Sequence, residues 1–137
     1  SFETKEYDKF LENISNGSKW YFRLKANPVV QKFDPQKKRN RIFPHITTEY
    51  QQQWLEKQSH KYGFSLENEK WLVTGSKWYD FRKNMDSNMK VKLLAVTYEG
   101  ILTVTDADAL RNALVNGIGR EKAYGMGLMT LAGIKNG

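Results

Sequence analysis

The sequence contains no cysteine in its 137 residues, which excludes disulfide-held secreted domains and zinc sites built on thiolates. A chain without cysteine also fits the reducing environment of the cytoplasm. Its apolar runs are short: none approaches the ~20 residues that a transmembrane helix needs, and no signal peptide is visible. We therefore expect a cytoplasmic protein that does not bind a membrane.

Sequence signatures of catalysis are equally scarce. Histidine occurs only at His45 and His60, and there is no His-Glu-x-x-His motif and no carboxylate cluster with metal-ligand spacing. A serine nucleophile elbow and a P-loop are also absent. The dinucleotide-binding fingerprint fails because Lys122 stands where its third glycine is required. We therefore expect no metal and no cofactor.

Glycine is concentrated in one segment, residues 117–127, which reads GIGREKAYGMG and is called the glycine loop below. Glycines free the backbone from the steric limits of a Cβ atom, so amide groups there can turn outward and approach a ligand closely. Two cations and an aromatic residue accompany them, a combination that suits a polyanion. The candidate contacts are Gly117, Gly119, Arg120, Lys122, Tyr124 and Gly125. The alternative interpretation needs no ligand: Gly117 ends a helix and the loop leads tightly into a last strand.

Positive charge is also concentrated. The whole chain has a net charge of +7, and residues 17–45 hold eight cations against one acid, which gives this segment alone a net charge of +7. The cations are Lys19, Arg23, Lys25, Lys32, Lys37, Lys38, Arg39 and Arg41. Such a local excess suggests a docking site for phosphates with salt-dependent affinity. The run from Lys37 to Arg41, between Pro35 and Pro44, could also be an ordinary solvated loop.

Hydrophobic periodicity and capping residues predict the elements of the first half of the chain. A helix is expected from Thr4 to a stop at Gly17. A strand over residues 20–26 alternates apolar positions with basic and aromatic ones, so one of its faces should be buried. After the basic loop, a capping box of Thr48 and Gln51 starts a second helix that Gly63 closes. The buried side of that helix is expected to hold Tyr50, Trp54, Leu55 and Tyr62.

In the second half, strands are predicted over residues 70–82 and 89–98, with a turn at Glu99–Gly100 into a short continuation over residues 101–104. Asp106 should cap a helix whose inward residues are Leu110, Ala113 and Leu114, and the glycine loop should lead into a last strand over residues 128–132.

From residue 18 onward the predicted order is β-α-β-β-α-β. That order is typical of an α+β, ferredoxin-like (RRM-like) fold, in which two helices cover one face of an antiparallel sheet. The apolar content of 39%, including 13% aromatic residues, is sufficient for one core. We divide the chain into a leading linker helix over residues 1–17 and a ferredoxin-like domain over residues 18–137.

The glycine loop closely resembles the C-terminal glycine-rich loop of CRISPR-associated repeat-processing endoribonucleases, in particular the CasE family of the type I-E Cascade complex. Other segments resemble this family in the same order along the chain. They are FRLKANP at residues 22–28, Trp54–Leu55 followed by Gly63–Phe64, and GILTVTD at residues 100–106. The resemblance runs from about Tyr7 to Leu131 and covers the C-terminal part of the family.

This resemblance implies a protein that binds the stem-loop of CRISPR repeat RNA, cuts once at the 3′ base of the stem to leave a 2′,3′-cyclic phosphate, and stays bound as a Cascade subunit. It also implies a first ferredoxin-like domain that is absent here, as the start at Ser1 rather than Met would fit. Duplex RNA is recognised mainly through its backbone geometry, so the basic segment should grip stem phosphates, with Arg39 and Arg41 as first choices. The glycine loop would hold RNA near the cleavage point.

The resemblance places the catalytic histidine in the absent domain, so this chain should lack nuclease activity. RNA cleavage without metal needs a general base and a general acid, for which histidine is suited. His60 falls late in a predicted helix on its polar side, where we expect it to be solvated. His45 follows the basic run and is a candidate for RNA contact, and less so for catalysis. Glu121 departs from the family loop, because an acid beside phosphates is unfavourable unless it points away.

Two further classes of function stay open at this point. One is a self-contained RNA-binding module of the RNA-recognition-motif type, with Tyr21 and Tyr124 as stacking platforms and no enzyme activity. The other is a structural subunit whose exposed sheet and basic loop bind protein partners in a ribonucleoprotein. Upstream gene sequence would separate the first from the endoribonuclease, and salt-insensitive binding to a neighbouring subunit without RNA would favour the second.

Overall fold

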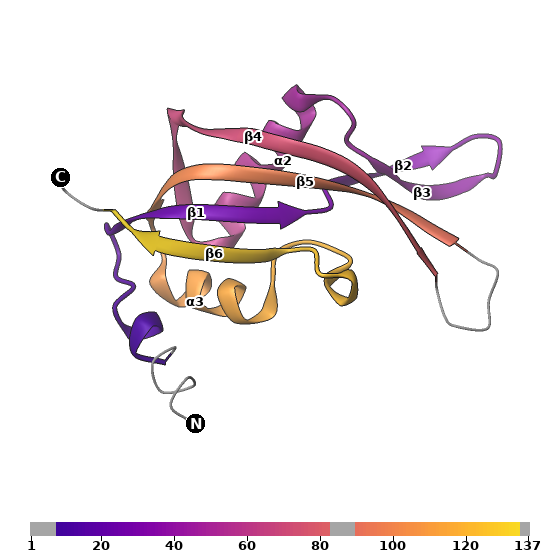
Figure 1. Cartoon of the computed structure of the whole chain (residues 1–137). Helices are drawn as coiled ribbons and strands as arrows, with labels where there is room; N and C mark the ends of the chain where they lie inside the picture. Colours follow the sequence, from indigo (N-terminus) through magenta and orange to yellow (C-terminus); the bar gives the residue numbers. More distant parts are fainter. Residues whose placement is uncertain (1–7, 83–89, 135–137) are drawn as a thin grey trace.

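The computed structural model describes residues 8–82 and 90–134 and has an α+β fold in which two helices cover one face of an antiparallel sheet (Figure 1). The strands are β1 (Lys19–Ala26), β2 (Val29–Asp34), β3 (Arg39–Pro44), β4 (Phe64–Arg82), β5 (Lys90–Val104) and β6 (Leu128–Gly133). The helices are α2 (Thr48–Tyr62), α3 (Ala107–Asn116) and the 3₁₀ turn η1 (Lys122–Tyr124). The main sheet has the order β4-β5-β1-β6, and all its neighbours are antiparallel. The predicted ferredoxin-like fold is thereby confirmed.

Strand β1 lies between β5 and β6 and shows why the sheet has one covered and one open face. Phe22, Leu24 and Ala26 are buried, whereas the alternate residues Tyr21 and Arg23 are exposed. Successive side chains of a strand point to opposite faces, so the apolar set packs under the helices. The face turned away from α2 and α3 is called the open face below.

The core is formed where the covered face meets the two helices. Leu55 of α2 and Leu110 of α3 are fully buried, as is Tyr98 of β5. The Tyr98 hydroxyl donates to the Gln51 carbonyl oxygen at 2.7 Å, which satisfies a polar group inside the core. Burial raises the pKa of the Tyr98 phenol, so this hydroxyl keeps its proton and acts as a donor.

The ends of α2 confirm the predicted stop and correct the predicted start. Gly63 closes the helix in the left-handed conformation, as expected. The residue that caps the start is Thr47, whose hydroxyl accepts from the Tyr50 amide, so the predicted capping box one residue later is wrong. The Gln51 side chain instead donates to the carbonyl oxygens of His45 and Ile46. Gln51 is therefore buried, while Tyr50, which was predicted on the buried side, is 54% exposed.

The segment predicted as a basic loop is a β-hairpin. Strands β2 and β3 pair with each other in a separate two-stranded sheet, and residues 35–38 form the turn. Asp34 stabilises this turn because its Oδ1 accepts from the Gln36 amide at 3.0 Å. Neither strand has a buried residue, so the sequence shows no alternation between a buried apolar face and a solvated polar one. We call β2, β3 and their turn the basic hairpin.

Two other predicted boundaries are wrong. Strand β5 runs without a turn through Glu99 and Gly100, and Gly100 pairs with Phe22 of β1. A Cβ atom at Gly100 would lie 2.4 Å from the Trp71 Cα, so the glycine there permits close approach of β4 rather than a turn. The strand before it, β4, begins at Phe64 and has irregular register between Leu66 and Trp71.

The first helix also ends earlier than predicted. Its described part covers residues 8–12 and stops before Gly17, while its expected start at Thr4 lies outside the described residues. Arg111 of α3 explains this end: its guanidinium donates to the carbonyl oxygens of Leu11 and Ile14 at 2.8 and 2.6 Å. The side chain thus satisfies carbonyls that a longer helix would have used internally. Asp106 caps α3, as predicted.

In the described part of the chain, neither α2, with 15 residues, nor α3, with 10, has the length and apolar content of a membrane-spanning helix.

Candidate nucleic-acid interface

Three segments meet at the end of the sheet where β1 finishes (Figure 1). The basic hairpin extends beyond β1, the glycine loop precedes β6, and the far half of the β4–β5 ladder continues past the glycine loop. The register places Lys25, near the end of β1, opposite Leu128 at the start of β6. The fold therefore brings together the two segments that the sequence marked as candidate binding sites.

The basic hairpin carries five cations, Lys32, Lys37, Lys38, Arg39 and Arg41, and one acid, Asp34. The acid is neutralised within the hairpin, because Arg41 Nη1 lies 2.9 Å from Asp34 Oδ2. The hydrogen bond from Arg41 lowers the pKa of the Asp34 carboxyl. Arg39 and the two turn lysines are exposed and make no ion pair among the residues that the structure describes. The hairpin thus presents a surplus of free positive charge.

The glycines of the glycine loop mainly allow close packing. Gly117, Gly119, Gly125 and Gly127 all have φ between +80° and +88°. A Cβ atom at Gly119 would lie 3.1 Å from the Trp54 ring, and one at Gly127 would lie 2.3 Å from the Ile118 carbonyl oxygen. The loop is therefore folded tightly against α2 and against itself.

Most loop amides are used inside the protein. Gly117 donates to the Ala113 carbonyl, Gly125 to that of Lys122, and Gly127 to that of Lys25. The expectation of outward amides is thus wrong for Gly117 and Gly125, and Gly117 caps α3 as the alternative interpretation required. Within the described residues, the amides of Gly119 and Arg120 donate to no protein acceptor. These two remain available to a ligand.

Beside the contact of Gly119 with Trp54, a hollow of about 350 Å³ opens between the glycine loop and α2. Its walls include Trp54 and Tyr62 of α2, and its cations are Lys61, Arg120 and Lys122. No carboxylate lines it, and among the described residues none of these three cations forms an ion pair. Three uncompensated cations beside an aromatic wall create a favourable site for an anionic ligand such as a phosphate group.

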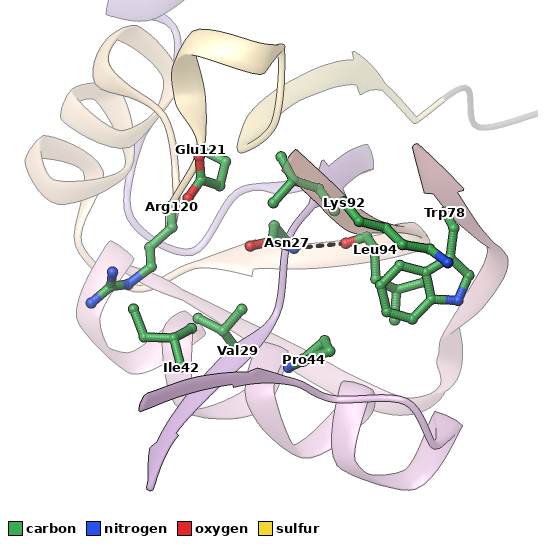
Figure 2. A pocket seen from close by; sticks show the side chains of 10 residues that line it. Asn27, Val29, Ile42, Pro44, Trp78, Lys92, Leu94, Arg120 and Glu121 are labelled. Carbon is green, nitrogen blue, oxygen red and sulfur yellow. Dashed lines mark hydrogen bonds between the residues drawn. The ribbon is translucent and has the colours of Figure 1, made fainter. Parts of the chain in front are cut away.

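A smaller pocket of about 110 Å³ lies on the other side of Arg120, between the loop and the base of the basic hairpin. Figure 2 shows Arg120 reaching toward Val29 and Ile42, while Lys92 extends to Trp78 on the opposite side. The Lys92 ammonium lies 5.2 Å from the centre of the Trp78 ring. Arg120 is thus the one cation shared by this pocket and the larger hollow.

Glu121 lines the smaller pocket but not the larger hollow. It adopts a left-handed backbone conformation with φ +63°. The only acid of the glycine loop therefore lies outside the lining of the hollow that Lys61, Arg120 and Lys122 share.

The two histidines differ in setting. His45 follows the basic hairpin and stacks on Tyr50 with ring centres 5.9 Å apart, beside a hollow of about 230 Å³ that Lys57 also lines. Burial, with a contribution from the Lys32 charge, lowers the pKa of His45. Among the described residues no carboxylate forms an ion pair with its ring. His60 is exposed in the last turn of α2, as predicted.

The remaining predicted contacts lie on the open face. Arg23 forms an ion pair with Glu99 at 3.8 Å, and its side chain is 68% exposed. Lys25 Nζ donates to the Tyr79 hydroxyl at 3.3 Å. Tyr124 turns toward the same side, where its ring lies 4.7 Å from that of Phe81. The predicted residues therefore lie on two surfaces. One surface consists of the basic hairpin and the hollow between the glycine loop and α2, and the other is the open face of the sheet.

Sequence reasoning missed Lys61, Lys92 and the β4 residues Lys77, Tyr79 and Phe81. Strand β4 carried a usable signal, since Lys77, Tyr79 and Phe81 alternate within the predicted strand and must share a face. Lys61 carried none, because its approach to the glycine loop depends on the tertiary fold. In the described ranges, no three His, Asp or Glu side chains gather as a metal site would require.

The comparisons with known proteins agree on one group. A family model described as "CRISPR associated protein" matches residues 1–133. The CRISPR system Cascade subunit CasE of Escherichia coli strain K12 is 35% identical over 120 residues, which cover 82% of this chain and 57% of that protein. The CRISPR-associated endoribonuclease Cse3 of Thermus thermophilus is 32% identical over 130 residues, covering 90% and 60% respectively.

Solved structures agree with this result. The structure of CRISPR endoribonuclease Cse3 bound to a 19-nucleotide RNA matches with a TM-score of 0.72 and 28% identity, and the match covers 88% of this chain and 58% of that one. The chain thus spans less than two thirds of the length of each relative named here.

Proposed function

Because the chain belongs to the CasE family of CRISPR-associated proteins, we propose that it provides RNA binding to an endoribonuclease that processes CRISPR repeat RNA. It would bind the repeat stem-loop, and the protein of which it is part would cut at the 3′ base of the stem without a metal ion. The product would stay bound while the protein serves as a Cascade subunit. The absence of cysteine agrees with a cytoplasmic location.

The basic hairpin is the observation that carries this proposal. It projects from the domain, and its single acid is held by Arg41. Its other cations form no ion pair among the described residues and can contact phosphates. Proteins recognise double-stranded RNA mainly through its backbone and shape. A projecting two-stranded element with cations on both strands and in the turn is suited to that role.

The hollow beside the glycine loop would hold RNA at the foot of the stem. Arg120, Lys122 and Lys61 would contact phosphates there, with the free amides of Gly119 and Arg120 as further donors. The sequence-based contacts Gly117 and Gly125 would then shape the loop rather than touch RNA through their amides.

We propose that the chemical step belongs to a part of the protein outside this chain. Cleavage of RNA through the 2′-hydroxyl needs a base and an acid on either side of the scissile phosphate. His45 stacks on Tyr50 and forms no ion pair with a carboxylate of the described residues, and His60 lies exposed in the last turn of α2. This chain alone would therefore bind the repeat hairpin without cutting it.

Titration of a labelled repeat hairpin at about 50 and 200 mM salt tests the role of the basic hairpin. Arg39→Ala should weaken binding and reduce the slope of log affinity against log salt by about one, since one phosphate contact is lost. Lys70→Ala, which removes an exposed cation of β4 that lies near Glu67, is the matched control and should leave the slope unchanged. Equal behaviour of the two variants would remove Arg39 from the interface.

A further inference from the structure

A row of three aromatic rings lies on the open face, beyond the end of β1. Tyr79 and Phe81 are alternate residues of β4, and their ring centres are 6.0 Å apart. Tyr124 of the glycine loop continues the row, with its ring 4.7 Å from that of Phe81. All three rings keep part of their surface exposed. We call Tyr79, Phe81 and Tyr124 the aromatic row.

Two lysines converge on one end of this row. The Lys25 ammonium lies 4.4 Å from the centre of the Tyr79 ring, and the Lys77 ammonium lies 5.1 Å from the same centre. A tyrosine ring attracts one cation over its face, but two like charges beside one ring also repel each other. An anion placed between them would relieve that repulsion.

Within the described part of the chain, no carboxylate supplies this anion. Neither Lys25 nor Lys77 forms an ion pair. Asp80 lies between Tyr79 and Phe81 in the strand and so points to the opposite face of the ladder. Glu99, on the open face, is occupied by Arg23. The row therefore combines exposed aromatic surface with two uncompensated positive charges.

We propose that the aromatic row binds single-stranded RNA, with bases stacked on the rings and a phosphate between Lys25 and Lys77. The proposal rests on the proposed function, which supplies the RNA, and adds a second surface to it. Aromatic stacking requires unstacked bases, so the ligand is a single strand rather than the stem. The charge of this surface favours RNA over an apolar protein segment. An apolar segment would bury the Lys25 and Lys77 ammonium groups without a partner of opposite charge.

The glycine loop joins this surface to the proposed stem site. Arg120 lines the hollow against α2, and Tyr124, four residues later, joins the aromatic row. RNA leaving the foot of the stem at Arg120 would thus reach Tyr124 within the same loop. The single strand expected on the row is the segment that adjoins the hairpin.

Three labelled RNAs test this inference: a blunt repeat hairpin, the same hairpin with a single-stranded tail of about eight nucleotides, and oligouridine of the same length as the tail. The tail should increase the affinity of the wild-type chain. The double variant Tyr79→Leu/Phe81→Leu keeps apolar cover but removes two stacking faces. It should lose that gain, by about tenfold for each stacked base, and bind the blunt hairpin as before.

Two further variants control for folding and for nonspecific loss. The double variant Lys25→Gln/Lys77→Gln leaves the rings in place. It should reduce the salt dependence of the extra affinity that the tail gives, and leave the salt dependence of blunt-hairpin binding unchanged. Leu72→Ser removes an exposed side chain from the same strand and face, outside the row, and should change neither affinity. Thermal unfolding of each variant identifies any that does not fold.

The outcomes separate this inference from the proposed function. A tail that adds nothing to wild-type affinity, or a ring variant that weakens blunt and tailed hairpins alike, would overturn it and leave the row as a brace for the glycine loop. If the wild type does not bind the blunt hairpin, the proposed function fails, and binding of oligouridine then tests the inference separately. Oligouridine binding by the wild type that is lost in both double variants would support the aromatic row as a binding site. No oligouridine binding by the wild type would overturn the inference.

Discussion

The pKa of His45 is lowered by folding, which gives a test of the structure by pH. Burial beside Tyr50 and the nearby Lys32 charge lower its pKa in the folded chain below the ordinary 6.5. As pH falls through 6.5, the unfolded chain therefore binds a proton that the folded chain does not yet take up. The free energy of unfolding should therefore decrease as pH falls from about 6.5 to the folded pKa, and it should level off below that value. At a pH more than about one unit above 6.5, His45 is neutral in both states and should have no effect on stability.

Urea unfolding between pH 5 and 8 measures this effect. His45→Gln should remove that part of the pH dependence, because its amide does not titrate. A wild type and variant with parallel curves over the whole range would show that His45 titrates equally in both states.

At the scale of single residues, the sequence names candidate cations for phosphate contact but does not show which of them are held in ion pairs. Arg39 and Arg41 are two positions apart and were equivalent candidates. The fold places Asp34 against Arg41, and Arg39 forms no ion pair with any residue that the structure describes. That difference depends on the hairpin register, which the run of charges concealed, so Arg39 is the sharper test of phosphate contact.

At the scale of elements, the glycines of the glycine loop differ in how closely other atoms pack around them. A methyl group at Gly125 would meet nothing within 4 Å, whereas one at Gly127 would collide with the Ile118 carbonyl. Gly125→Ala should cost about 1–2 kcal/mol of unfolding free energy, because only the left-handed backbone is strained. Gly127→Ala should cost distinctly more, since backbone atoms must also move. Urea unfolding of both variants checks the ranking, and equal losses would contradict the packing described for the loop.

The link between the N-terminal segment and α3 is a second element-scale feature. Arg111 bonds the carbonyls of Leu11 and Ile14 and also pairs with Asp108 at 2.7 Å. Arg111→Ala should cost about 1–3 kcal/mol, because hydrogen bonds to a charged donor are lost and carbonyls are left unpaired.

Hydrogen exchange provides the specific readout for this link. Residues 13–17 should lose protection in the Arg111→Ala variant while the sheet stays protected. Arg111→Lys keeps the charge but not the fork of donors, so it should restore only part of the protection. Uniform loss of protection over the whole chain would instead mean that Arg111 supports global stability.

Element types were predictable wherever one face is apolar, as in β1 and α3. Boundaries failed where a local signal competed with tertiary packing. Gly100 resembled a turn residue, yet it lies in the continuous strand β5 because Trp71 packs against it. Tyr50 fell in the predicted apolar pattern of α2, yet it stacks on His45 at the surface because Gln51 takes the buried position to bond the preceding carbonyls.

For the whole molecule, the fold divides the predicted contacts between two surfaces that meet at the glycine loop. The order of elements was enough to predict the ferredoxin-like sheet. The division itself could not be predicted, because it depends on which side of the loop Arg120 and Tyr124 take after the tight turns at Gly119 and Gly125. The loop thus acts as a junction between a surface suited to stem phosphates and a surface suited to unpaired bases.

The most direct test of the account is to measure binding and cleavage of a labelled repeat hairpin by this chain at two salt concentrations, with and without the separately supplied N-terminal domain of a full-length relative. The account predicts salt-dependent binding by the chain alone and cleavage, leaving a 2′,3′-cyclic phosphate, only when that domain is added. Cleavage by the chain alone would contradict the proposed division of roles, and absence of salt-dependent binding in both cases would contradict the RNA-processing function itself.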